Sequence, residues 1–161
     1  MEMKFKTTGL RTLLLLVASF ITFASTAQDL SGNWKLNTSK SKLNAEFSMA
    51  PGEVIITHNG NNLTVEKHHD FQGQAFTSKD NFTLDGKECI NEGFQGTKKK
   101  STANWSDDKK VLTIKSSLDM GDGGLVTITE TLTLESGILT MVSAASSNWG
   151  DFSETQVFEK K

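Results

Sequence analysis

Three histidines, His58, His68 and His69, are the residues of this sequence best suited to binding a metal ion. Neutral imidazole is the commonest protein ligand of transition metals. They fall in two β-rich runs joined by a turn, where alternation places His58 and His69 on one face and His68 on the other. His58 adjoins the turn, whereas His69 lies six residues beyond Leu63, about 20 Å along the strand at ~3.3 Å per residue. We therefore expect no metal site, and His69 stays a candidate polar group in a cavity.

Glu130 is the other side chain that could do chemistry. It lies between Ile128 and Leu132 on the apolar face of a β-rich run. A buried carboxylate must find a partner or become protonated. It could bind the polar end of a ligand, act as an acid or base, pair with an inward lysine, or be exposed by a change of register. No nucleophile elbow or His-Glu-x-x-His motif is present, so we expect no enzyme and no cofactor.

Turn residues divide the sequence that must position these groups into short β-rich runs. Asn59 to Asn62, Asp85-Gly86, Gly121 to Gly124 and Ser136-Gly137 are typical hairpin turns. Runs spaced by 8–12 residues predict an all-β sandwich or barrel. Only Thr38 to Ser48 could form a short helix. The ten predicted strands are Gly32 to Asn37, Glu53 to His58, Leu63 to Phe71, Gln74 to Leu84, Lys87 to Asn91, Thr97 to Trp105, Lys110 to Leu118, Leu125 to Leu134, Ile138 to Ala144 and Phe152 to Glu159.

The inner faces of these strands are apolar but carry polar groups. Phe76 and Phe82 share a face with Ser78 and Asp80. A sandwich core is dry throughout, whereas a barrel with a solvated cavity tolerates such interruptions. The pattern favours the barrel. Alternation also places Lys99 on the side of Trp105, although a run of lysines usually marks a solvated face.

Composition bounds the partners and the compartment. The 161 residues predict one domain, and 17 basic against 19 acidic residues leave no basic excess for nucleic acid. Residues 1–27 have the pattern of an export signal: Lys4, Lys6 and Arg11, then the apolar core Leu13 to Ala24, then small residues before Gln28. Cleavage there would leave 134 residues with 14 basic and 18 acidic side chains, a net charge of −4 and no transmembrane segment. Cys89 is the only cysteine, and in an oxidising compartment it is either buried or awaits an intermolecular partner; its neighbour Ile90 favours burial.

The two ends of the mature sequence resemble a known family. Gly32-Asn33-Trp34 resembles the Gly-x-Trp motif that opens the first strand of lipocalins and fatty-acid-binding proteins, and WKLN with KSK is similar to small exported bacterial lipocalin-like proteins. Thr155 to Lys160 is similar to the last strand of fatty-acid-binding proteins. There an Arg and a Tyr hold the ligand carboxylate, at positions that are Gln156 and Phe158 here. The resemblance implies a barrel, and these replacements argue against carboxylate capture at that site. The segment 38–52 is also short for the two-helix lid of that family.

The sequence therefore predicts an exported, periplasmic or secreted, monomeric up-and-down β-barrel of about 8–10 strands over residues 28–161. The expected function is binding of a small hydrophobic or amphipathic ligand inside the barrel. Alternatives are an envelope interaction module or inhibitor acting through its loops, with Trp149 exposed, and then a small-barrel enzyme using Glu130. The candidate ligand-binding residues are Trp34, His69, Phe76, Phe82, Ile114, Ile128, Glu130, Leu132, Gln156 and Phe158.

Overall fold

The computed structural model describes residues 26–45, 47–120 and 124–161. The body of the expected export signal and Gly121 to Gly123 of one expected turn lie outside these ranges. Within them, no helix is long and apolar enough to cross a membrane.

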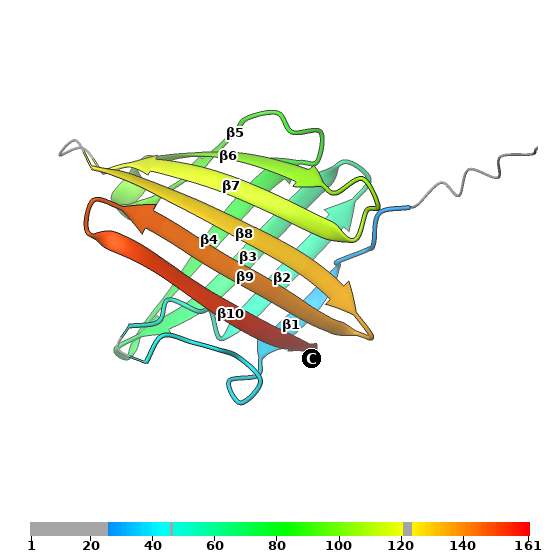
Figure 1. Cartoon of the computed structure of the whole chain (residues 1–161), viewed down its shortest axis with the longest axis horizontal. Coiled ribbons are helices and arrows are strands. Elements are labelled where there is room, and N and C mark those ends of the chain that lie inside the picture. Colours follow the sequence, from blue (N-terminus) through cyan, green and yellow to red (C-terminus); the bar gives the residue numbers. More distant parts are fainter. Residues whose placement is uncertain (1–25, 46, 121–123) are drawn as a thin grey trace, which may run out of the picture.

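Ten antiparallel strands form a single sheet that curls into a nearly closed barrel, with β1–β4 behind and β6–β10 in front in Figure 1. The strand order β4-β3-β2-β1-β10-β9-β8-β7-β6-β5 brings the two ends of the sheet, β4 and β5, to a common seam. All ten predicted strands are present, each within three residues of its expected bounds. They are β1 (Gly32–Leu36), β2 (Glu53–Asn59), β3 (Asn62–Phe71), β4 (Gln74–Thr83), β5 (Cys89–Glu92), β6 (Lys98–Trp105), β7 (Val111–Asp119), β8 (Leu125–Glu135), β9 (Ile138–Ser147) and β10 (Gly150–Lys160), with a 3-10 turn η1 (Phe94–Gly96) before β6.

Two-residue turns fix the register of the longest hairpins. Gln72 and Gly73 join β3 to β4 with φ of 53° and 79°, and Ser136 and Gly137 join β8 to β9 with φ of 50° and 78°. Two consecutive residues of positive φ make a turn whose twist matches that of the flanking strands. Because side chains alternate along a strand, this register decides which residues face the interior.

Side chains rather than a backbone ladder bridge the seam. The Asn81 N–H donates to Asn91 Oδ1 at 2.8 Å, and Asn91 Nδ2 donates to the Asn81 carbonyl at 3.1 Å. The Thr83 N–H donates to Cys89 Sγ at 3.3 Å. The expected burial of Cys89 is wrong: its side chain is half-buried because β5 is an edge strand of four residues.

The apolar core fills one end of the barrel, which we call the closed end, where the β2–β3, β6–β7 and β8–β9 turns lie. Trp34 is 1% exposed there and donates from Nε1 to the Leu30 carbonyl at 3.0 Å. Leu30 itself is fully buried, so the chain before β1 contributes to the apolar core at the closed end. The buried cluster comprises Leu30, Trp34, Val54, Ile56, Leu63, Val65, Phe82, Ala103, Leu112, Ile114, Leu132, Leu139, Met141 and Phe158.

The segment between β1 and β2, residues 38–52, crosses the opposite end, which we call the open end. We call this segment the strap. The short helix expected over Thr38 to Ser48 is absent from its described residues. Instead the Asn37 carbonyl accepts from the Lys40 and Ser41 N–H groups in a tight turn. Ser41 Oγ also donates to that carbonyl, and Asn and Ser side chains that bond locally to the backbone compete with a helix.

Candidate functional site

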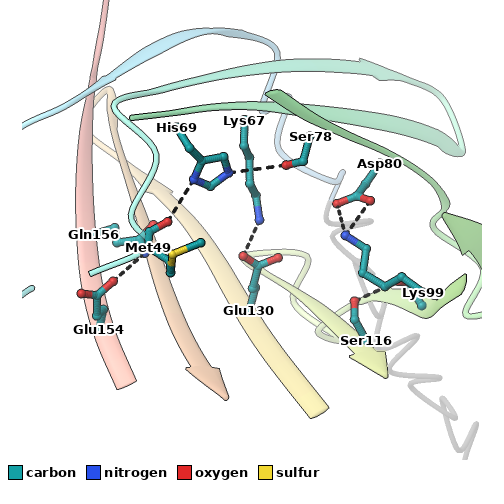
Figure 2. Close-up of polar contacts among 11 residues, drawn as sticks. Met49, Lys67, His69, Ser78, Asp80, Lys99, Ser116, Glu130, Glu154 and Gln156 are labelled. Carbon is teal, nitrogen blue, oxygen red and sulfur yellow. Dashed lines mark hydrogen bonds and ion pairs between the residues drawn. The ribbon is translucent and has the colours of Figure 1, made fainter. Parts of the chain in front are cut away.

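A layer of polar side chains crosses the barrel interior above the apolar core. We call it the polar belt. Its side chains project inward from β3, β4, β6, β7, β8 and β10, and most of them are labelled in Figure 2. They lie on the same strand faces as the apolar core, one or two alternation steps nearer the open end. They are Lys67, His69, Ser78, Asp80, Lys99, Ser101, Ser116, Glu130, Glu154 and Gln156.

The first ion pair of the belt joins β3 to β8 across the interior. Lys67 Nζ lies 2.5 Å from Glu130 Oε1, and the two side chains are only 12% and 14% exposed (Figure 2). Of the roles open to Glu130, the structure shows pairing with an inward lysine. Removing two charges from water is costly unless they are paired, so this pair is mutually dependent.

The second ion pair joins β4 to β6 beneath the seam. Lys99 Nζ lies 2.7 Å from both carboxylate oxygens of Asp80 and donates its hydrogen bond to Oδ2. The two side chains are 15% and 5% exposed. Lys99 therefore faces inward, as alternation predicts, whereas Lys98 and Lys100 are exposed like an ordinary solvated run. Nearby, Ser101 and Ser116 share a hydrogen bond of 2.8 Å.

His69 connects the belt to the strap. Its Nδ1 lies 3.1 Å from the Met49 carbonyl, which can only accept, so Nδ1 carries the proton. The imidazole stacks on Phe76 with ring centroids 4.6 Å apart and an interplanar angle of 8°. Burial lowers the pKa of His69, and the neighbouring Lys67 charge lowers it further. The neutral ring is the form that this environment favours.

Glu154 and Gln156 complete the belt beneath the strap. Glu154 is 2% exposed, and its Oε1 accepts from the Asn44 backbone N–H at 2.8 Å. Its Oε2 accepts from Gln156 Nε2 at 3.2 Å. Among the described residues no lysine forms an ion pair with Glu154, so the belt carries three carboxylates against two ammonium groups. Side chains alternate along β10, and both of these side chains face inward together with Phe158.

A cleft of about 460 Å³ opens above the belt, beside the seam. Its walls come from β4, from the β5–η1 connection, and from β6, β7 and β8. Phe76, Leu118 and Ile128 form its apolar wall, and Ser78 and Lys99 bring the belt into it. Thr77 and Lys79 also reach the cleft, from the outer face of β4. Other hollows of the described chain are lined mostly by outward-facing side chains such as Lys35, Lys115 and Thr127. Of these hollows, the cleft at the open end combines inward apolar groups with the inward charged side chain of Lys99.

The structure distributes the ten candidate residues over three levels of the barrel. Phe76 and Ile128 line the cleft. His69, Glu130 and Gln156 belong to the polar belt, one level below. The other five lie in the packed core at the closed end: Trp34, Phe82, Ile114, Leu132 and Phe158. Contact of any of these residues with a ligand stays a prediction.

Several residues of this site were not singled out from the sequence. Lys99, Ser78 and Leu118 line the cleft, as do Glu92, Gly93 and Gln95 around the end of β5. Alternation already placed Ser78 and Lys99 inward. Alternation could not predict that the sheet closes with β4 beside β5, which brings Asp80 of β4 to Lys99 of β6.

Comparison with known proteins shows which known fold this barrel has. No protein-family model matches the sequence, and no curated protein matches it. The zebrafish ileal bile acid-binding protein, crystallised with cholic acid, is 16% identical and aligns over 81% of this chain and 98% of its own, with a TM-score of 0.52. Lipid binding protein 8 of Caenorhabditis elegans, in its apo form, is 12% identical over 81% of this chain and 94% of its own, with a TM-score of 0.55. The chain has the calycin fold. The predicted fold class, an antiparallel β-barrel of the lipocalin and fatty-acid-binding type, is confirmed.

Proposed function

We propose that this protein binds a small hydrophobic or amphipathic molecule in the cleft at the open end of its barrel. The observation that carries the proposal is the cleft itself, whose 460 Å³ falls within the range of small-molecule sites. An apolar wall with a few convergent polar groups is the usual composition of such a site. The two neighbours named above bind a bile acid and lipids, and their shared fold supports the same use of this interior.

The shape of the interior sets where the ligand sits. The closed half is filled by side chains, with Trp34, Leu132 and Phe158 at most 1% exposed. A ligand therefore occupies the open half and rests on the polar belt rather than reaching the base of the barrel. Its apolar body packs on Phe76, Leu118 and Ile128.

Displacement of the neutral dye Nile red measures the proposed binding. The purified domain is stripped of lipid and titrated with dye and then with 1-decanol. Leu118→Trp fills the cleft from β7 and should abolish the dye signal, because Leu118 is a wall residue only 7% exposed. Val142→Trp is the matched control, since Val142 is exposed on β9 and should leave binding unchanged. Equal binding by both variants, with both still folded by circular dichroism, would refute the proposal.

We further propose that the protein is exported and acts outside the cytoplasm. The support is the signal-like pattern of residues 1–27 together with the packing that follows it. Gln28 Nε2 donates to the Leu134 carbonyl at 3.0 Å, and Leu30 is fully buried. Cleavage after Ala27 would therefore leave these contacts in place. Mass spectrometry of the protein from culture medium and periplasm tests this directly: a chain starting at Gln28 supports it, and an intact chain retained in the cytoplasm contradicts it.

One observation favours the loop-mediated alternative. Trp149, in the β9–β10 turn, is 66% exposed, as the interaction-module hypothesis expects. A binding partner recognised through this turn would be lost on Trp149→Ala, whereas Nile red binding in the cleft would not change.

A further inference from the structure

The charges around the cleft constrain the polar end of its ligand. Both inward lysines of the described chain already have a carboxylate partner, Lys67 with Glu130 and Lys99 with Asp80. Glu154 adds a third inward carboxylate, held only by the Asn44 N–H and the Gln156 amide. The described interior therefore holds three carboxyl groups against two ammonium groups, and both ammonium groups are already paired.

Among the described residues, a carboxylate ligand would meet no unpaired inward cation. Lys79, which reaches the cleft from the outer face of β4, already lies 3.7 Å from Glu66 Oε2. Burying an unpaired charge is costly, and the nearby Asp80 carboxylate would repel it. Gln156 and Phe158, on the last strand, supply no cation either. The negative end of a fatty acid or bile salt is therefore disfavoured at each polar position of the belt.

A neutral polar end meets no such cost. Lys99 lines the cleft, and its ammonium has three N–H donors, of which one is given to Asp80 Oδ2. A ligand oxygen can accept from a remaining donor while the ion pair stays intact. Ser78 Oγ, also on the cleft wall, can accept from a ligand hydroxyl. The Lys99 donor and the Ser78 acceptor together suit a ligand hydroxyl group, which both accepts and donates a hydrogen bond.

We propose that the cleft selects neutral amphiphiles that end in a hydroxyl group, and discriminates against carboxylates, because Asp80 cancels the charge of Lys99 on the cleft wall and Glu130 cancels that of Lys67 in the belt below. This inference rests on the proposed function and names the ligand class of the same site. Asp80 is then a specificity-determining residue: it acts through Lys99 by neutralising that cation.

Three ten-carbon ligands test the proposal: 1-decanol, decanoate and decylammonium, each titrated below its aggregation concentration at pH 7.5 by isothermal titration calorimetry. The wild-type protein should bind decanol at least about tenfold more tightly than decanoate, since an uncompensated buried charge costs more than 1.4 kcal/mol. Decylammonium should also bind more weakly than decanol, because its charge would have to sit beside the Lys99 ammonium.

Asp80→Asn should remove most of the preference for decanol by freeing the charge of Lys99. Decanoate should gain about tenfold in affinity, while decanol changes by less than about threefold. Glu135→Gln is the matched control, because it removes one negative charge from an exposed position at the closed end. A thermal melt of each variant confirms that it is folded, and Lys99→Met combined with Asp80→Leu gives a second route: decanol should then weaken, with no gain for decanoate.

The outcomes separate the two proposals. Tighter binding of decanoate or decylammonium than of decanol by the wild-type protein overturns the neutral-ligand inference while leaving ligand binding intact. Equal responses of Asp80→Asn and Glu135→Gln overturn the role of Asp80. Absence of binding by all three ligands and by Nile red refutes the proposed function, and this inference with it.

Discussion

Breaking the Lys67–Glu130 pair should destabilise the barrel far more than breaking an exposed ion pair would. Both side chains are about seven-eighths buried, and each relies on the other for charge compensation. Glu130→Leu leaves the Lys67 ammonium buried without a partner, at a cost of about 3 kcal/mol, the lower end for a buried pair. For a domain of this size the melting temperature should fall by about 10 °C.

The matching double variant separates charge from packing. Lys67→Met with Glu130→Leu replaces the pair by apolar side chains of similar volume, and such replacements are often neutral or stabilising. We expect its free energy of unfolding to lie within about 1 kcal/mol of the wild-type value. Urea unfolding at pH 7.5, followed by tryptophan fluorescence and circular dichroism, measures both single variants, Glu130→Leu and Lys67→Met, and the double variant with the wild type.

The reasoning fails under either of two results. A single variant that costs less than about 1 kcal/mol would show that the pair behaves as a solvated one. A double variant as unstable as the single ones would show that the pair itself holds the barrel together. The predicted pattern instead means that the Lys67–Glu130 pair contributes little net stability, which agrees with the proposed role of these charges in ligand selection.

Three other perturbations follow from local contacts. The pKa of His69 is lower in the folded protein than in the unfolded chain. Its contribution to stability is therefore complete above about pH 6.5 and is lost as the pH falls through the folded-state pKa. His69→Phe should make the free energy of unfolding depend less on pH between pH 7.5 and 5, and an unchanged slope would contradict this. Asn91→Ala should cost about 1–3 kcal/mol and speed hydrogen exchange at the Asn81 amide, which loses its acceptor; slow exchange there would show that the seam closes without Asn91. The Asp85 carboxyl should titrate in NMR with a pKa of about 2, because the Lys87 side chain hydrogen-bonds to it. Lys87→Ala should raise the pKa of Asp85, and an unchanged pKa in this variant would contradict the role given to Lys87.

Local pattern was enough to predict the strands and their faces. Ser78, Asp80 and Phe82 share the inward face as expected, because side-chain alternation depends only on neighbours in the sequence. The polar interruptions of the inner face correctly indicated a barrel. In the structure they form ion pairs and hydrogen bonds rather than standing free in a cavity.

The partners of these polar groups depend on how the sheet closes. Lys67 and Glu130 are 63 residues apart, on strands that are not neighbours in the sheet, so their contact exists only once the barrel has formed. The position of the cleft depends likewise on the seam between β4 and β5. The strap was expected to contain a short helix, but its path is set by remote contacts, such as the Asn44 N–H with Glu154. None of these distances is encoded in a local pattern.

Chemical-shift mapping of a bound amphiphile tests the central claim most directly. Amide spectra of the ¹⁵N-labelled domain are recorded during titration with 1-decanol. Ligand binding in the cleft predicts saturable shifts at Phe76, Ser78, Gly93, Lys99 and Leu118, with the amides of the packed core around Trp34 and Leu132 unmoved. Shifts confined to the outer faces of the strands, or no saturable shift at all, would contradict it.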